Sequence, residues 1–205
     1  MTNAPRPIIL AADVKRRMHN RTVAALIGAA AIMPLPAVAD EIGDAFLEAE
    51  ALLEAGDPDA VWDAFDRAVE LFWAAAPLGF AEVRLVEAVA GYGDYTPSPD
   101  NRYRPGDQLT AYIEPVGYGW TAIGEDYRIR FRLDLVIAST IRGVVVDEEG
   151  FATVERLVRS RGREFQATVV LTVPPLPADS YEIRITFHDV ATGKEAVATL
   201  GFVVE

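Results

Sequence analysis

Few side chains in this 205-residue chain could act as a nucleophile or a general base. There is no cysteine, and the two histidines are His19 and His188. Because His19 lies in a segment that we interpret below as a cleaved leader, His188 is the imidazole left to consider. Successive side chains on a strand point to opposite faces, so the adjacent Asp189 would not orient its ring. We therefore expect no catalytic residue, no metal centre, no cofactor and no enzyme activity.

The best candidate site combines a carboxylate with aromatic rings. Glu114 follows Tyr112 closely and precedes a glycine-rich loop that carries Tyr118 and Trp120. Tyrosine and tryptophan are enriched at binding surfaces, so Tyr112, Glu114, Tyr118 and Trp120 form a candidate site for a ligand or partner. Glu114 would also be the first carboxylate to test in a hydrolase. The interpretation that we favour is that Tyr118 and Trp120 cap a hydrophobic core and that the glycines permit the turn.

Charge is unevenly distributed along the chain. Residues 40–100 contain fifteen acidic and two basic residues, whereas residues 101–205 contain fifteen acidic and twelve basic ones. The net charge of −12 argues against nucleic-acid binding, which needs clustered lysine and arginine. Arg128, Arg130 and Arg132 alternate along one predicted strand and so share its outward face. We expect the acidic part to dock on this arginine-bearing face; alternatively, these arginines bind an anionic partner or a polysaccharide.

The N-terminal segment has the layout of a secretory signal peptide. Basic residues between Lys15 and Arg21 precede an apolar run at residues 23–33, and small residues at 37–39 suit a signal peptidase. The run is too short for a hydrocarbon core of roughly 30 Å. We expect residues 1–39 to be removed after Ala39, leaving a periplasmic or secreted protein without a membrane span. Met18, beside the basic residues, is an alternative start.

Residues 40–79 show the apolar spacing of an acidic helical hairpin. Gly56 interrupts the pattern, Asp57 can cap a second helix, and Pro58 suits the first position of that helix. These features predict two helices joined by a tight turn.

The hairpin resembles a single tetratricopeptide unit. The resemblance is carried by Leu53, Glu54, Ala55, Gly56, Asp57, Phe65, Ala68 and Leu71. Val61 and Trp73 depart from the motif, and no second copy follows. A lone unit cannot bury its own apolar face. We therefore expect either a hairpin docked on the following domain, which we favour, or a surface for a partner helix.

Beyond the hairpin, residues 80–102 are rich in turn formers and are interpreted as a surface linker. From residue 103 the apolar period changes to two, with a turn at 147–150. Alternating segments lie near residues 109–113, 127–135, 141–146, 151–158, 165–173, 181–187 and 196–204. About seven such strands predict an antiparallel β-sandwich over 103–205 and hence an α+β fold class.

The sandwich region resembles immunoglobulin-like and fibronectin-type-III-like domains. The resemblance is carried by residues 176–181, 189–194 and 202–204, and Tyr181 would form the tyrosine corner of such folds. It implies a fold and no activity.

Our first hypothesis is a non-enzymatic periplasmic interaction or accessory protein that binds another envelope protein. The alternative is a carbohydrate-binding module that stacks Tyr112, Tyr118 and Trp120 on a glycan. The third hypothesis is a carboxylate-based hydrolase.

Overall fold

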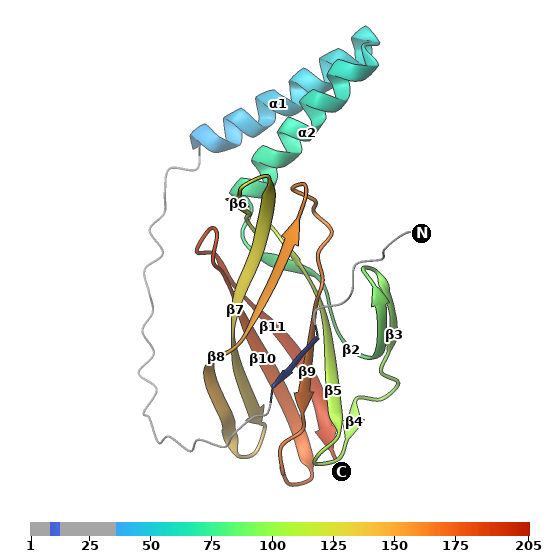
Figure 1. The fold of residues 1–205 in the computed structure, drawn as a ribbon, viewed down its shortest axis with the longest axis vertical. Helices are drawn as coiled ribbons and strands as arrows, with labels where there is room; N and C mark the ends of the chain where they lie inside the picture. Colours follow the sequence, from blue (N-terminus) through green and yellow to red (C-terminus); the bar gives the residue numbers. More distant parts are fainter. Residues whose placement is uncertain (1–8, 13–35) are drawn as a thin grey trace. The chain divides into compact units, whose positions relative to one another are not determined.

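A computed structural model describes residues 9–12 and 36–205, which form two compact units divided between Ala76 and Pro77 (Figure 1). One is a helical hairpin and the other is a β-sandwich, so the predicted α+β fold class is confirmed. The basic segment and apolar run of the predicted leader lie outside the described residues. Neither described helix is both long and apolar enough to cross a membrane.

The helical unit contains α1 (Pro36–Ala55) and α2 (Pro58–Ala75). Gly56 ends α1 with a positive φ of 75°, a conformation that glycine adopts without strain. The Asp57 side chain then caps α2 by accepting the Ala60 N–H at 3.1 Å. The turn was thus predicted correctly, but α1 begins at Pro36, so the expected cleavage after Ala39 falls within its first turn.

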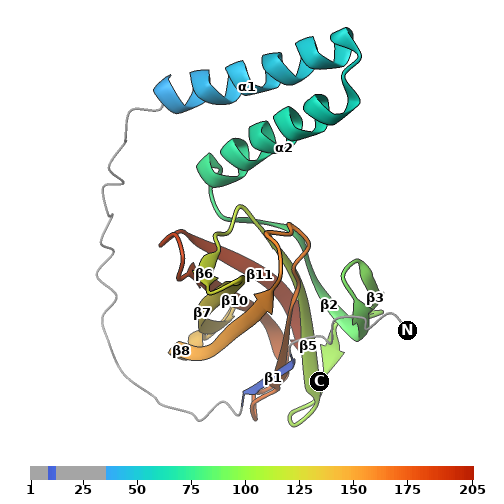
Figure 2. The ribbon, with the colours of Figure 1, turned by 45° about the horizontal axis from the view of Figure 1, so that its top comes forward.

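The β unit packs two sheets face to face (Figure 2). Sheet A runs in the order β1 (Ile9–Ala12), β9 (Ala167–Thr172), β5 (Gln108–Val116), β2 (Gly79–Gly91) and β3 (Asp94–Pro97). Sheet B runs in the order β4 (Arg102–Tyr103), β11 (Glu195–Val204), β10 (Asp179–Asp189), β7 (Asp126–Ser139) and β6 (Thr121–Ile123), and β8 (Gly143–Val158) also pairs with β7.

The hydrophobic core lies between the sheets, where alternate residues of each strand are buried. Ile129, Phe131 and Leu133 of β7 are at most 1% exposed, and the intervening Arg130 and Arg132 are exposed. Phe131 packs edge to face on Phe187 of β10, with ring centroids 5.4 Å apart. Burying one such side chain contributes about 1.5–3 kcal/mol, so packing can hold this cysteine-free sandwich together.

Residues 80–102, predicted to be a linker, instead form strands of the sandwich. β2 pairs with β5 and then with β3, and its residues Leu85 and Val86 are buried. The turn formers around Gly93 close the β2–β3 hairpin, and Pro97 lies at the end of an edge strand, where proline is tolerated. The prediction was wrong because hairpin turns and linkers use the same residue types.

The predicted turn at 147–150 was also wrong, because these residues lie inside the long strand β8. The pairing of β8 with β7 shifts register between Leu133 and Leu135, as at a β-bulge. Gly150 has a φ of 61° there, and its N–H donates to Asp134 at 2.6 Å. The turn-like residues therefore bend one strand and do not separate two.

The strand order agrees with the immunoglobulin-like resemblance. β2, β5 and β9 occupy one sheet, and β7, β10 and β11 occupy the other, as in the two-sheet arrangement of such domains. Tyr181, near the start of β10, donates its hydroxyl to the Pro177 carbonyl at 2.8 Å. This is the bond that the predicted tyrosine corner requires.

Candidate functional site

The helical hairpin has a seam made of alanine. Ala45 and Ala49 of α1 and Ala64 and Ala68 of α2 are at most 8% exposed, and Ala68 is completely buried. Their spacing of four places each pair on one face of its helix. Since an alanine side chain buries a single methyl group, these four residues contribute little hydrophobic stabilisation, and the larger residues Ile42, Leu52, Val61, Val69 and Leu71 are only half-buried.

Other large apolar side chains of the hairpin are exposed. Trp62 is 67% exposed, Leu53 68% and Phe72 56%, and Phe46 and Phe65 are 39% and 42% exposed. The Phe65 ring contacts both Phe46 and Trp62 edge to face, with centroids 6.3 and 6.2 Å apart. Aromatic residues from both helices thus form one cluster. Intervals of seven from Phe46 to Leu53 and from Phe65 to Phe72 extend it along each helix into an apolar stripe.

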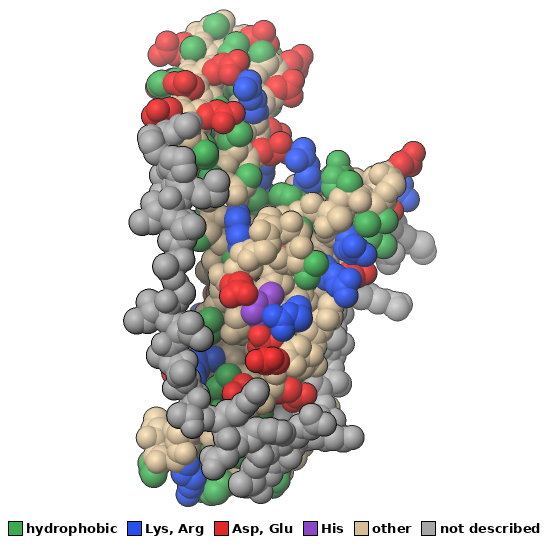
Figure 3. Space-filling view, turned by 90° about the vertical axis from the view of Figure 1, so that its left-hand side faces the viewer, with side chains coloured by type: hydrophobic (Ala, Val, Ile, Leu, Met, Phe, Trp, Pro, Cys, Tyr) green, Lys and Arg blue, Asp and Glu red, His purple; other side chains and the backbone are tan. Residues whose placement is uncertain are grey.

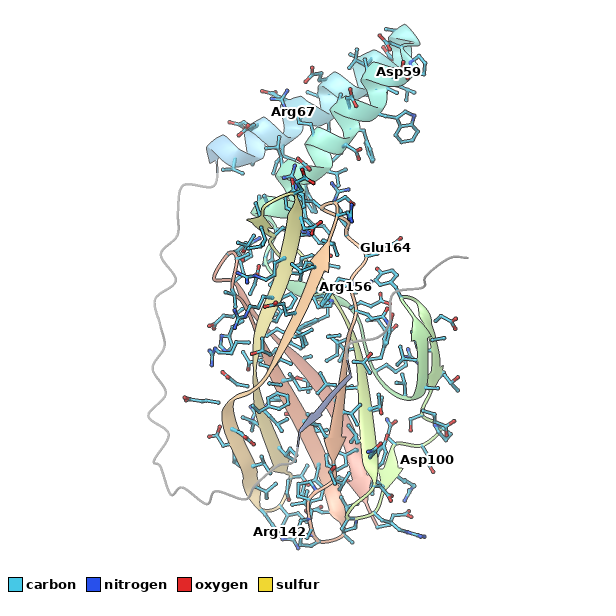
Figure 4. All side chains as sticks on the ribbon, in the orientation of Figure 1. Asp59, Arg67, Asp100, Arg142, Arg156 and Glu164 are labelled. Atoms are coloured by element: carbon cyan, nitrogen blue, oxygen red, sulfur yellow. The ribbon has the colours of Figure 1, made fainter. Side chains whose placement is uncertain are left out.

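A shallow acidic groove lies on the same hairpin. It is lined by Asp40, Glu41, Asp44, Ala45, Glu48 and Arg67. Arg67, on α2, approaches Glu48 at 3.7 Å, and both side chains are more than half exposed (Figure 4). Residues 40–76 carry eleven acidic residues and this one arginine. The hairpin therefore presents carboxylates beside its apolar stripe, and Figure 3 shows acidic and hydrophobic side chains together on it.

The three predicted docking arginines do share the outer face of sheet B. Arg130 approaches Glu155 of β8 at 3.6 Å, and the Arg132 guanidinium donates to Asp134 at 2.8 Å. Arg128 is half-buried on the same side of β7. Docking of the acidic hairpin on this face stays a prediction.

His188 lies on the same outer face, between two carboxylates. Its Nδ1 is 2.5 Å from Glu195 of β11, and its Nε2 is 2.5 Å from Asp134 of β7. An imidazole can donate to both only when both ring nitrogens carry hydrogen. Burial pushes the pKa of Asp134 upward, but the Gly150 N–H, His188 and Arg132 outweigh it and hold that pKa below 3.8. His188 and Arg132 thus contact Asp134 from neighbouring positions, and Glu195 adds a second carboxylate beside His188.

Tyr112 and Glu114 lie together on the face of β5 that points away from the core, and both are buried. The Tyr112 hydroxyl donates to the Glu114 carboxylate and accepts the Gly93 N–H at 2.7 Å. Burial raises the pKa of Tyr112, and the bond to Glu114 raises it further. Tyr95 of β3 covers the Tyr112 ring, with centroids 4.4 Å apart. The Tyr112 ring therefore has no exposed face on which a sugar could stack.

Glu114 has an acidic neighbour that the sequence did not reveal. Glu82 of β2 lies directly opposite it across the strand pair, and its carboxylate accepts from the Arg84 guanidinium at 3.1 Å. Like charges in this position are destabilising, and Arg84 and Tyr112 offset part of that cost. Each carboxylate is thus already bonded to a side chain of its own strand.

The loop with Tyr118 and Trp120 behaves as a core cap. Tyr118 is 1% exposed, contacts the rings of Trp120, Phe131 and Phe165, and donates its hydroxyl to the Gly162 carbonyl at 3.1 Å. Trp120 is half-buried. The structure therefore separates the four predicted site residues into a buried pair on sheet A and a cap at one end of the core.

Sequence reasoning missed two features that depend on strand register. Asp134 and Glu195 approach His188 from different strands, and Glu82, which lies opposite Glu114, belongs to the segment interpreted as a linker. A pattern within one strand gives the face on which a side chain lies, but it does not give the partners of that side chain on the next strand.

Neither protein-family models nor curated protein sequences match this chain. The tetratricopeptide and immunoglobulin-like resemblances therefore rest on the hairpin, the strand order and the tyrosine corner.

Proposed function

We propose that this chain is an exported, non-enzymatic accessory protein of the bacterial envelope whose helical hairpin binds a basic amphipathic helix of another envelope protein. The proposal is carried by one observation: the hairpin buries alanines in its seam and leaves Trp62, Phe65 and Phe72 exposed. Exposed aromatic residues that form a continuous patch are typical of interaction sites. Export is supported by the signal-peptide layout of residues 1–39.

The chemistry of the hairpin indicates the kind of partner. An apolar stripe along a helix pair fits the apolar face of another helix, as in helix-in-groove recognition. The carboxylates of Asp40, Asp44 and Glu48 beside it would pair with lysine or arginine at the rim of that interface. An anionic lipid surface or a nucleic acid would be repelled by the same carboxylates.

The glycan-binding alternative has less support. Its stacking residues Tyr112 and Tyr118 are 0% and 1% exposed, which leaves the half-buried Trp120 as the remaining aromatic candidate. The hydrolase alternative has paired carboxylates at Glu82 and Glu114, but each is bonded to a neighbour and Glu114 is buried.

The proposal is tested by replacing Trp62 with a photo-crosslinking amino acid in the full chain, expressed in bacterial cells. We expect a discrete covalent adduct with an envelope protein, and we expect the crosslinked peptide to be a basic amphipathic helix. Adding Phe65→Ser should remove most of the adduct, because interface aromatic residues at such positions contribute about 2 kcal/mol or more.

The matched control is the same crosslinker at Ile141, which is 81% exposed on the β unit. An adduct of equal yield from both positions would refute the hairpin as the binding surface. A crosslink from position 62 to the chain's own β7 would instead support docking on the face of Arg128, Arg130 and Arg132.

A further inference from the structure

In the described part of the chain, the outer edge of β9 is covered by the four-residue strand β1. β9 pairs with β5 on one side, from Ala167 to Thr172, and its other side holds β1 (Figure 2). Its sequence, Ala-Thr-Val-Val-Leu-Thr, contains no charge, proline or glycine. A strand of this composition at a sheet edge is a template for pairing with another chain unless something covers it.

Other edges of the sandwich carry protection that β9 lacks. β3 is short and contains Asp94 and Pro97, and β8 carries three consecutive acidic residues and a register shift. β11 is covered at its end by β4, and β2 lies beside it. Charge, proline, bulges and covering segments are the usual devices against edge pairing. β9 itself contains no charged residue, no proline and no bulge, so its sequence does not protect this edge against pairing with another strand.

The structure shows how the edge is occupied. Residues Ile9–Ala12 add to β9 as a parallel strand, with Ile9 opposite Thr168 and Ala12 opposite Leu171. The four residues, Ile-Leu-Ala-Ala, are uncharged. They belong to the segment that signal peptidase is expected to remove, and a start at Met18 would omit them as well. In either case the processed chain would present β9 without this cover.

We infer that the β9 edge is a strand-acceptor site. The full chain fills it with its own residues 9–12, and the processed chain fills it with an extended, uncharged apolar segment of a partner protein in the same parallel register. Main-chain hydrogen bonds would supply the affinity, and alternate side chains of the added strand would supply the specificity. This inference uses the proposed removal of the leader but a different surface from the hairpin, so either can fail alone.

The test compares amide hydrogen exchange in the full chain and in its Leu10→Pro/Ala11→Pro variant. Two consecutive prolines remove main-chain donors and prevent regular pairing. We expect those amides of residues 167–172 that point toward β1 to exchange at least roughly tenfold faster in the variant, whereas the amides that point toward β5 stay protected. Protection of β10 and β11 should be unchanged, which shows that the sandwich is still folded.

The second arm adds a synthetic peptide of residues 6–14 to the proline variant. We expect it to restore the protection of residues 167–172, whereas the same peptide with both prolines should not. Unchanged exchange of β9 in the variant would overturn the inference, as would equal protection by both peptides. Dimerisation of the variant with β9 protected, measured by sedimentation, would make the occupant a second copy and also overturn it.

Discussion

Asp189 shows how one buried carboxylate fixes two loops. It is 1% exposed and accepts the Gly119 N–H at 2.8 Å, the Ala191 N–H at 3.0 Å and the Thr192 hydroxyl at 2.5 Å. The Lys194 ammonium donates to the Gly117 carbonyl at 3.0 Å, and burial lowers the pKa of Lys194. The aromatic loop is therefore held against the β10–β11 turn, which explains why it caps the core.

Gly119 has no room for a side chain in this arrangement. A Cβ at position 119 would lie 2.4 Å from the Thr192 methyl carbon and 3.1 Å from the Ala191 Cβ. We predict that Gly119→Ala lowers the free energy of unfolding by about 1–3 kcal/mol, measured by urea denaturation.

The control for this prediction is Gly201→Ala, where no atom lies within 4 Å of the added Cβ. Adding Thr192→Ser to Gly119→Ala should recover part of the loss, because it removes the colliding methyl and keeps the hydroxyl. Equal effects at positions 119 and 201 would contradict the steric explanation.

Asp134 should make stability depend on pH. Its folded-state pKa lies below the ordinary value of 3.8, so ionised Asp134 stabilises the fold above that pH, and the stabilisation is lost as pH falls through the folded pKa. We predict that Asp134→Asn lowers the free energy of unfolding by about 1–2 kcal/mol at pH 7 and by less at pH 3. Urea denaturation at both values measures the difference.

Asp147→Asn removes the same charge from an exposed position on β8 and serves as the control. It should change stability little at either pH. An Asp134→Asn effect of the same size at pH 7 and pH 3 would show that the loss does not come from the ionised carboxylate.

At the scale of elements, α1 and α2 depend on small residues at their contact. Ala68 is completely buried in the seam, whereas Ala51 on α1 is exposed. We predict that Ala68→Leu overpacks the seam, costs about 1–3 kcal/mol and speeds amide exchange across α2 in the full chain. Ala51→Leu should leave exchange nearly unchanged. Similar exchange in both variants would mean that the helices do not pack through these alanines.

Element boundaries show where sequence patterns were sufficient. Gly56, Asp57 and Pro58 predicted the α1–α2 turn because each acts through its own backbone or side chain. β8 was misassigned because Gly150 is compatible with either a turn or a bulge. Only its bond to Asp134 on β7 distinguishes the two, and that pairing is not encoded within residues 147–150.

For the whole molecule, the period of two was enough to predict a sandwich, and the immunoglobulin-like resemblance implied the bond that the Tyr181 hydroxyl makes with the Pro177 carbonyl. It was not enough to place the candidate site. The exposure of Trp62 and Phe65 follows from the alanines that occupy the seam instead, and a helical apolar pattern alone does not say which of its residues will be covered. Likewise, the burial of Tyr112 required β3, which lies in the segment interpreted as a linker.

The residues that pack the two helices together differ from the residues that the hairpin exposes. Ala45, Ala49, Ala64 and Ala68 are buried where the two helices meet, whereas Leu53, Trp62 and Phe72 are more than half exposed. If the hairpin binds a partner as proposed, substitutions at these exposed positions would change the binding surface and leave the buried alanines in place. Such a surface would then follow a diverging partner over evolutionary time while the scaffold beneath it stays constant.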